Sequence, residues 1–390
     1  MSRGIVVFKE KVKRSKGLYK AYSFGGKIIV NFLKLFVRPD SKLILFNSFG
    51  GKKFDDSPKA IYEQMRKDER FNSYKLVWAF HNPDEFSGIE NKIQTDRLPY
   101  FITALKARCW VSNSTIQRGI VFKGKKTFSF NTWHGSPIKS MANSGNGKNQ
   151  IMDMCDVILA QSRFEVDAFV HDWKLPADKY KVFGYPRNDR LAHYTEEEKE
   201  QTKKRLGIPL DNYVVLYAPT FRDYLLDSDS RCTLEVPFDY AYWKNLFQEN
   251  LTFLMRMHYE VARHNTLPDD PMWIDMTDYP NLNDLMIVAD ALISDYSSII
   301  FDFAVMDKPI INYTYDYDEY KLKRGLWIDV RKEFPCTDSS QELADLMQDA
   351  ILNPSKYIEH TTLFREKYVE EYGNATNLSV DCIYNNISDN

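Results

Sequence analysis

The sequence alternates short, continuous apolar runs with longer segments that mix apolar and charged residues. Continuous apolar runs are typical of strands covered on both faces, and such strands occur in parallel sheets flanked by helices. The pattern therefore predicts an α/β fold. The expected strands lie at residues 43–46, 75–80, 107–111, 127–130, 156–160, 213–217, 251–255, 273–274, 291–293 and 309–313.

A chain of 390 residues is too long for one ordinary core, so we expect two domains. The turn-rich residues 184–189 and a charged helix at 196–205 separate the two series of strands. Each series predicts a Rossmann-like, doubly wound domain, and two such domains facing a cleft form the GT-B architecture. Ligands bind such sheets at the carboxyl ends of the strands. The predicted units are residues 1–40, 41–190 and 191–390.

The first 40 residues form a basic N-terminal extension, with ten Lys or Arg against two acidic residues. Its apolar run at 28–37 contains Lys34 and falls short of the roughly 20 residues that a spanning helix needs. Basic residues interleaved with apolar ones predict an amphipathic helix that lies on an anionic membrane surface. The alternative is a solvated basic segment whose apolar stripe packs on its own domain.

Composition and motifs exclude other classes of protein. A formal net charge of −2 gives the chain no bias toward nucleic acid. The five cysteines are scattered without a CxxC pair, which indicates neither a disulfide framework nor a zinc site and fits a reducing cytoplasm. The sequence lacks a Walker lysine and a GxGxxG motif, so it supports neither an ATPase nor a plain dinucleotide fold. We expect no cofactor and no obligatory metal.

His134 follows the apolar run at 127–130 and is a candidate base. Gly135 would allow close approach of the backbone, and Ser136 before a proline is typical of a helix start. A helix beginning there would keep His134 neutral, so that it could accept a proton. A structural histidine bonded to a loop carbonyl would leave the same pattern.

A serine pair follows the strand at 291–293. Ser297 and Ser298 would begin a helix and present hydroxyl and amide groups to an anion such as a phosphate, although ordinary capping explains them equally well. Asp295 and Asp302 flank the pair. They could bind a polyol hydroxyl or orient a histidine, or they could be purely structural.

Cationic residues lie at other strand exits and near the expected hinge. Arg256 and His258 share one face after the strand at 251–255 and would suit a diphosphate, although such a pair is more often structural. Arg222 follows the strand at 213–217 and is a further phosphate candidate. Arg187 lies near the hinge and could reach the cleft.

Six segments occur in one order along the chain and together resemble a known family, the CDP-glycerol glycerophosphotransferases. The family builds wall teichoic acids and related polymers in Gram-positive bacteria. The likeness runs from about Ser41 to beyond Trp327. It is carried by residues 134–139 (HGSPIK), 184–189 (GYPRND), 217–222 (YAPTFR), 256–258 (RMH), 295–302 (DYSSIIFD) and 323–329 (KRGLWID).

The resemblance implies a GT-B-like fold and peripheral association with the inner face of the membrane. It implies transfer of glycerol phosphate from CDP-glycerol, or of ribitol phosphate from CDP-ribitol, to a polyprenyl-diphosphate-linked saccharide or a growing polyol-phosphate chain. His134 matches the proposed catalytic base. His258, Arg222 and the serine pair match residues around the donor diphosphate.

Two mild departures from the family pattern are Ser136 in place of a common Thr and Phe221 in place of a common Trp. The length of the chain resembles the primase or short-transferase forms. The alternatives to a glycerophosphotransferase are a ribitol-phosphate transferase, a GT-B nucleotide-sugar glycosyltransferase and a membrane-bound scaffold without catalysis. No residue in the sequence separates glycerol from ribitol.

Overall fold

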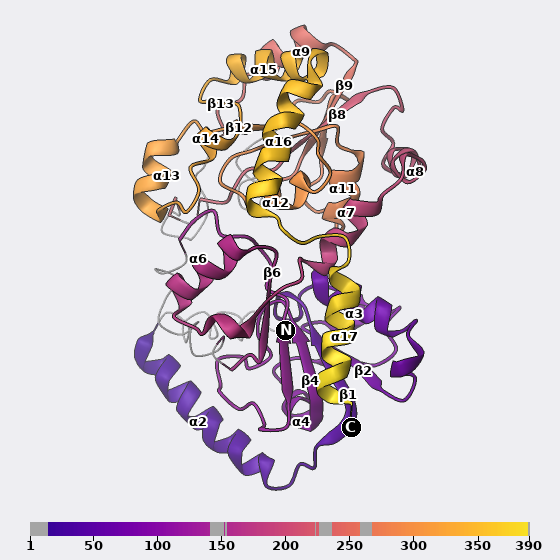
Figure 1. Cartoon of the computed structure of the whole chain (residues 1–390), viewed down its shortest axis with the longest axis vertical. Coiled ribbons are helices and arrows are strands. Elements are labelled where there is room, and N and C mark those ends of the chain that lie inside the picture. Colours follow the sequence, from indigo (N-terminus) through magenta and orange to yellow (C-terminus); the bar gives the residue numbers. More distant parts are fainter. Residues whose placement is uncertain are drawn as a thin grey trace.

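The computed structural model describes residues 15–140, 152, 154–222, 224–225, 236–257 and 267–388. These residues form two halves, each built around one parallel β-sheet with helices packed on it, and the halves lie one above the other in Figure 1. The expected architecture of two doubly wound α/β domains is confirmed.

The first sheet has seven strands in the order β3-β2-β1-β4-β5-β6-β7, and all neighbouring strands are parallel. The order reverses between β1 and β4, which is the position where doubly wound sheets bind ligands. The strands are β1 (Asp40–Asn47), β2 (Lys75–Phe80), β3 (Lys92–Gln94), β4 (Ala107–Ser112), β5 (Phe128–Asn131), β6 (Val157–Ala160) and β7 (Tyr180–Val182).

The second sheet has six parallel strands in the order β10-β9-β8-β11-β12-β13. This order repeats the pattern of the first sheet, with the reversal between β8 and β11. The strands are β8 (Tyr213–Tyr217), β9 (Leu251–Met255), β10 (Trp273–Asp275), β11 (Ala291–Ser294), β12 (Ile310–Tyr313) and β13 (Cys336–Thr337).

Helices connect the strands and cover the sheets. Those before the second sheet are α2 (Lys16–Lys34), α3 (Asp56–Met65), α4 (Leu98–Lys106), α6 (Arg163–Trp173), α7 (Asp189–His193) and α8 (Glu196–Leu206), with short 3-10 helices η1 (Phe49–Gly51), η2 (Glu69–Phe71), η3 (Pro83–Glu85), η4 (Ala177–Lys179) and η5 (Pro186–Asn188). The later ones are α9 (Tyr240–Phe247), α11 (Leu282–Val288), α12 (Ile299–Ala304), α13 (Tyr317–Arg324), α14 (Val330–Glu333), α15 (Ser340–Leu352), α16 (Pro354–Tyr368) and α17 (Ala375–Ile387).

The apolar runs of the sequence are buried because both faces of each strand meet other side chains. In β1, Ile44 and Phe46 belong to one hydrophobic cluster, whereas Leu43 and Leu45 belong to another. Successive side chains of a strand point to opposite faces, so a run without polar residues supplies two cores at once.

The last helix crosses back to the first half. We expected residues 191–390 to form one unit, but α17 packs against α3 and places Val380, Ile383 and Ile387 in a core of the first sheet (Figure 1). The apolar stripe of α17 gives no hint of which sheet it covers, so the sequence could not assign it.

The chain passes between the halves twice, and the two passages lie side by side. The first runs through η5 and α7, and the second joins α16 to α17. His193 Nε2 lies 2.7 Å from the carbonyl oxygen of Gly373, and the Asp189 carboxylate accepts hydrogen bonds from the amides of Ala375 and Thr376 at 3.0 and 2.7 Å.

Helix α2 lies along the first half (Figure 1). Val30 is buried in a core of the first sheet, Leu33 and Val37 pack beside it, and Tyr22 donates a hydrogen bond to the carbonyl of Arg118 at 3.3 Å. One stripe of the helix therefore packs on its own domain, as the alternative interpretation expected. Among the described residues, no helix is long and apolar enough to cross a membrane.

Candidate active site

Two predicted strand exits from different halves meet at Gly135 and Ser298. A Cβ added to Gly135 would stand 2.9 Å from the Ser298 hydroxyl oxygen. Gly135 follows β5 of the first sheet and Ser298 follows β11 of the second. The candidate site is therefore assembled from both halves, at the carboxyl ends of their strands.

The ring of His134 is held from three directions. Its Nδ1 lies 2.7 Å from the carbonyl oxygen of Asn113. The Trp133 ring centroid lies 4.1 Å away, and that of Phe49 lies 5.9 Å away in an edge-on arrangement. Because a carbonyl oxygen only accepts hydrogen bonds, Nδ1 carries the proton, and the basic lone pair of the neutral ring is on Nε2.

Trp133 gives the His134 loop its shape. Its φ of 52° lies in the left-handed region, which is costly for a large side chain. Two hydrogen bonds stabilise this conformation: the Trp133 amide donates to Asn131 Oδ1 at 2.8 Å, and the indole donates to the carbonyl of Gly135 at 2.7 Å. His134 itself remains exposed at the surface of the loop.

Asn113 is a site residue that sequence reasoning missed. Besides its carbonyl contact with His134, its side-chain oxygen accepts the amide of Phe49 at 2.8 Å. One residue at the end of β4 thus places both the Nδ1 partner and a ring neighbour of His134. The sequence feature that could have indicated Asn113 is the polar cluster at 112–114, which directly follows an apolar run.

The helix expected to begin at Ser136 is absent from the described residues 136–140. This segment instead pairs with the second half: Lys139 forms an antiparallel bridge with Leu326, and the Trp327 amide donates to the carbonyl of Ile138 at 2.7 Å. The prediction was wrong because residues distant in sequence satisfy the backbone groups that a helix would have paired internally. The positive helix end expected beside His134 is therefore not found there.

Ser136 anchors the His134 loop to the first half. Its hydroxyl accepts a hydrogen bond from the Gln161 side chain at 2.6 Å. Gln161 also contacts the buried carboxyl of Glu165, which accepts from the Tyr185 hydroxyl at 2.9 Å. Burial raises the pKa of Glu165, while hydrogen bonds from Ser136, Gln161 and Tyr185 act in the opposite direction.

The serine pair begins a helix as predicted. Ser298 is the N-cap of α12, and its side chain makes no capping hydrogen bond. Ser297 Oγ lies 3.5 Å from the Ile299 amide, at the limit of a hydrogen bond. Both serines are half-buried, so they lie at the surface of the interface rather than in a core.

Arg256 is the predicted cation that best suits a ligand anion. One terminal nitrogen donates to the carbonyls of Met276 and Tyr279, at 3.0 and 2.6 Å. In the part of the chain that the structure describes, no carboxylate lies within ion-pair distance of it. Burial lowers the pKa of Arg256, whereas Asp55 and Asp278 raise it.

Arg187 and Asp302 join the two halves to each other. The guanidinium donates to the Asp302 carboxylate at 3.0 Å and also lies 3.5 Å from Asp56. Asn188 donates to the same Asp302 oxygen at 2.7 Å. Of the two possibilities for Asp302, these contacts favour the structural one.

Arg222 and Asp295 lie behind the serine pair, and both are fully buried. They form an ion pair with a separation of 2.9 Å. Their predicted contact with the donor would therefore need a rearrangement.

His258 falls outside the described residues, and its place in the site stays a prediction. The described residues hold no cluster of three His, Cys, Asp or Glu side chains that could bind a metal.

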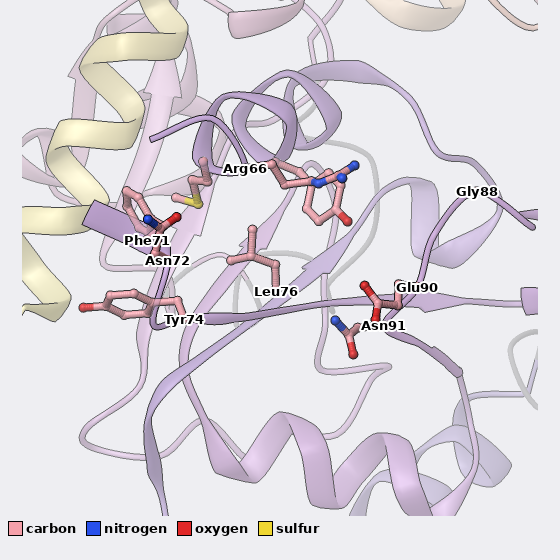
Figure 2. A pocket seen from close by; sticks show the side chains of 10 residues that line it. Arg66, Phe71, Asn72, Tyr74, Leu76, Gly88, Glu90 and Asn91 are labelled. Carbon is pink, nitrogen blue, oxygen red and sulfur yellow. The ribbon is translucent and has the colours of Figure 1, made fainter. Parts of the chain in front are cut away.

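A separate pocket of about 190 Å³ opens on the outer edge of the first sheet (Figure 2). None of the predicted site residues lines it. Its wall comes from α3, η2, β2 and the loop before β3, and consists of Tyr62, Met65, Arg66, Phe71, Asn72, Tyr74, Leu76, Gly88, Glu90 and Asn91.

A family model described as CDP-Glycerol:Poly(glycerophosphate) glycerophosphotransferase matches residues 29–385. The chain belongs to this family. It is therefore a transferase of the glycerophosphotransferase class, and both the expected family and the expected class of enzyme are confirmed.

The comparisons agree with this assignment. The teichoic acid glycerol-phosphate transferase of Staphylococcus aureus (strain NCTC 8325 / PS 47) is 30% identical over 368 residues, covering 87% of this chain and 92% of that protein. A structure of the wall teichoic acid polymerase TagF, a variant soaked with CDPG, has a TM-score of 0.84 and 26% identity and covers 98% of both chains. A UDP-GlcNAc 2-epimerase from Neisseria meningitidis shares the fold alone, with a TM-score of 0.53, 12% identity and coverage of 88% and 99%.

Replacing Gly135 with Ala should lower glycerophosphotransferase activity by about tenfold or more with little change in thermal stability, because misplacing reacting groups by a fraction of an ångström is costly. The added methyl group meets the Ser298 hydroxyl, so either that hydroxyl must rotate away or the two segments must move apart, and both changes disturb the serine pair. Gly88→Ala is the matched control, since nothing lies within 4 Å of its added Cβ. Equal activity in both variants would contradict the close contact. Activity and melting temperature measure the effect.

Proposed function

We propose that this enzyme transfers glycerol phosphate from CDP-glycerol to a polyprenyl-diphosphate-linked saccharide or a polyol-phosphate chain in wall teichoic acid synthesis. The observation that carries the proposal is the placement of His134 at the strand exit that touches the serine pair of the second half. Membership of the family and the likeness to TagF support CDP-glycerol as the donor.

The reaction joins the acceptor oxygen to the β-phosphorus of CDP-glycerol. The bond from that phosphorus to the bridging oxygen breaks, and CMP leaves with the electron pair. The acceptor proton passes to Nε2 of His134, because Nδ1 already carries a proton for Asn113. General-base assistance of this kind contributes typically about 10²- to 10⁴-fold.

Negative charge on the transferring phosphoryl group must be held by fixed donors. Ser297, Ser298 and Arg256 are the described residues that we assign to the donor phosphates, and His258 is assigned with them from the sequence. The two serines have hydroxyls at a helix start, and Arg256 has a charge without a carboxylate partner among the described residues. Arg187 and Asp302 keep the halves together.

A panel of activated donors tests the function. CDP-glycerol with an undecaprenyl-diphosphate-linked saccharide should give CMP and an acceptor whose mass increases by one glycerol phosphate or more. The panel includes CDP-ribitol and UDP-sugars, measured by CMP or UDP release and mass spectrometry of the product. Preference for CDP-ribitol would assign the ribitol reaction instead, and use of UDP-sugars alone would assign a glycosyltransferase.

Replacing His134 with Asn should reduce CMP release by about 10²-fold or more and leave the dissociation constant for CDP-glycerol nearly unchanged. The asparagine amide can still donate toward the Asn113 carbonyl, but it offers no basic nitrogen. His193→Asn is the control, because His193 also bonds a backbone carbonyl, that of Gly373. Full activity of the His134 variant would remove the base assignment. Initial rates and calorimetry provide the two measurements.

We further propose that α2 binds the cytoplasmic face of the membrane peripherally. Phe24, Ile28 and Phe32 follow one another at intervals of four residues along the helix, and Phe36 follows in the turn after its last residue; these side chains are 69, 56, 60 and 70% exposed. Residues four apart lie on the same side of a helix, so these side chains form one apolar stripe. Exposed Lys27 adds positive charge, which suits an anionic lipid surface.

The triple variant Phe24→Ser/Phe32→Ser/Phe36→Ser should bind phosphatidylglycerol vesicles at least about tenfold more weakly, because each ring contributes apolar area to the interface. The matched control is Leu322→Ser/Leu352→Ser/Leu363→Ser, which removes three exposed leucines elsewhere. Co-sedimentation with vesicles measures the bound fraction. Equal loss in both triples, or in neither, would place the membrane contact on another surface.

A further inference from the structure

Arg222 lies at the centre of a buried network that leads to both walls of the candidate site. Its guanidinium donates to Asp316 at 2.7 and 2.9 Å, to Asp295 at 2.9 Å and to the carbonyl of Thr220 at 2.6 Å. The side chain has no exposed surface. Protein groups therefore occupy the face that a donor phosphate would need.

The contacts of Asp295 form the first arm of the network, which leads to the serine pair, Ser297 and Ser298. Asp295 follows β11 directly, and its carboxylate accepts hydrogen bonds from the Thr220 amide at 2.9 Å, the Thr220 hydroxyl at 2.6 Å and the Tyr296 amide at 2.6 Å. Ser297 directly follows Tyr296 in the chain. The ion pair with Arg222 thus holds the carboxylate that shapes the start of the serine pair.

The other arm leads to the His134 segment. Asp316 is the N-cap residue of α13, and it also accepts the Tyr296 hydroxyl at 3.2 Å. Helix α13 ends at Arg324, and the next residues pair with the chain that follows His134: the Ser140 amide donates to the carbonyl of Gly325 at 3.3 Å. Movement of Asp316 would therefore be transmitted to the loop of the candidate base.

Stacked aromatic rings flank the network. The rings of Tyr296 and Tyr320 stack at 4.0 Å, and their centroids lie 5.0 and 4.9 Å from the carbon at the centre of the guanidinium. Two carboxylates surround one guanidinium, so the local charge does not favour a further anion. A guanidinium packed against stacked rings also has little freedom for a small displacement.

We propose that Arg222 is a positioning residue, which with Asp316 sets the serine pair opposite the His134 loop without touching the donor. This assignment rests on the proposed transfer reaction. It differs from direct binding of the diphosphate in a measurable way. Removing the charge of Asp316 would free Arg222 for a phosphate in the direct-contact case, but would loosen both arms in the positioning case.

The test compares Arg222→Lys, Asp316→Asn and the double variant. We expect each to lower kcat by about 10- to 100-fold, because the reacting groups lose their alignment, while the dissociation constant for CDP-glycerol changes less than about threefold. The double variant should be no slower than the worse single variant, since the two residues act as one unit. Tighter CDP-glycerol binding by Asp316→Asn, or weaker binding by Arg222→Lys with unchanged kcat, would overturn the proposal.

Two further variants keep the test decisive. Tyr296→Phe removes only the hydroxyl that bonds Asp316, so it should fold normally and lower kcat a few-fold at unchanged donor affinity; an unchanged kcat counts against the proposal. Arg365→Lys is the matched control, because Arg365 of α16 forms an ion pair with Asp307 at 3.0 Å, away from the candidate site. It should retain the kcat of the unmodified enzyme, and an equal loss there would overturn the assignment.

Hydrogen–deuterium exchange separates this inference from the proposed reaction. Asp316→Asn should accelerate exchange at residues 295–299 and 138–140, whether or not CDP-glycerol is the donor. Unchanged exchange at both segments would overturn the positioning role. Absence of CMP release by the unmodified enzyme would instead count against the proposed reaction alone.

Discussion

The candidate site depends on a short stretch of backbone pairing between the halves. The chain that leaves His134 runs through Ile138, whose side chain is buried in a core of the second sheet rather than of the first. Its backbone then pairs with Leu326 and Trp327. Apolar burial supplies the affinity between the halves and the hydrogen bonds supply the register. The position of His134 relative to Ser298 is therefore a property of the interface.

The charges at this interface fall into two groups with different physical consequences. Arg187 and Arg222 are buried with carboxylates, so their charge is used within the protein. Removing one partner of such a pair would leave the other uncompensated, which is usually costly. Arg256 bonds only carbonyls among the described residues, so no carboxylate of those residues is paired with its charge. Arg222 and Arg256 both follow the end of a strand, but Arg222 is paired with carboxylates and Arg256 with carbonyls. The bonded partner, not the position after a strand, therefore distinguishes the two arginines.

The sequence predicted the sheets well because strand burial depends on local pattern. Continuous apolar runs identified the inner strands but missed the short edge strands β3, β7 and β13, and polar residues after the runs placed His134 and Ser298 at the carboxyl ends of the sheets. Contacts between distant segments were not predictable in the same way. Ser136 before a proline matched a helix start, yet its segment pairs with Leu326 in the other half. The ion pair between Arg222 and Asp316 joins residues 94 positions apart, so nothing in the local sequence indicated that the predicted phosphate ligand is already paired within the protein.

The paired passages near His193 and Gly373 have a mechanical consequence. A single linker lets two domains swing and twist about a point. Two linkers bound side by side, here through Asp189 and the amides of Ala375 and Thr376, define an axis instead. A rotation of one half against the other would turn mainly about this axis, and it would change the separation of Gly135 and Ser298, which belong to different halves.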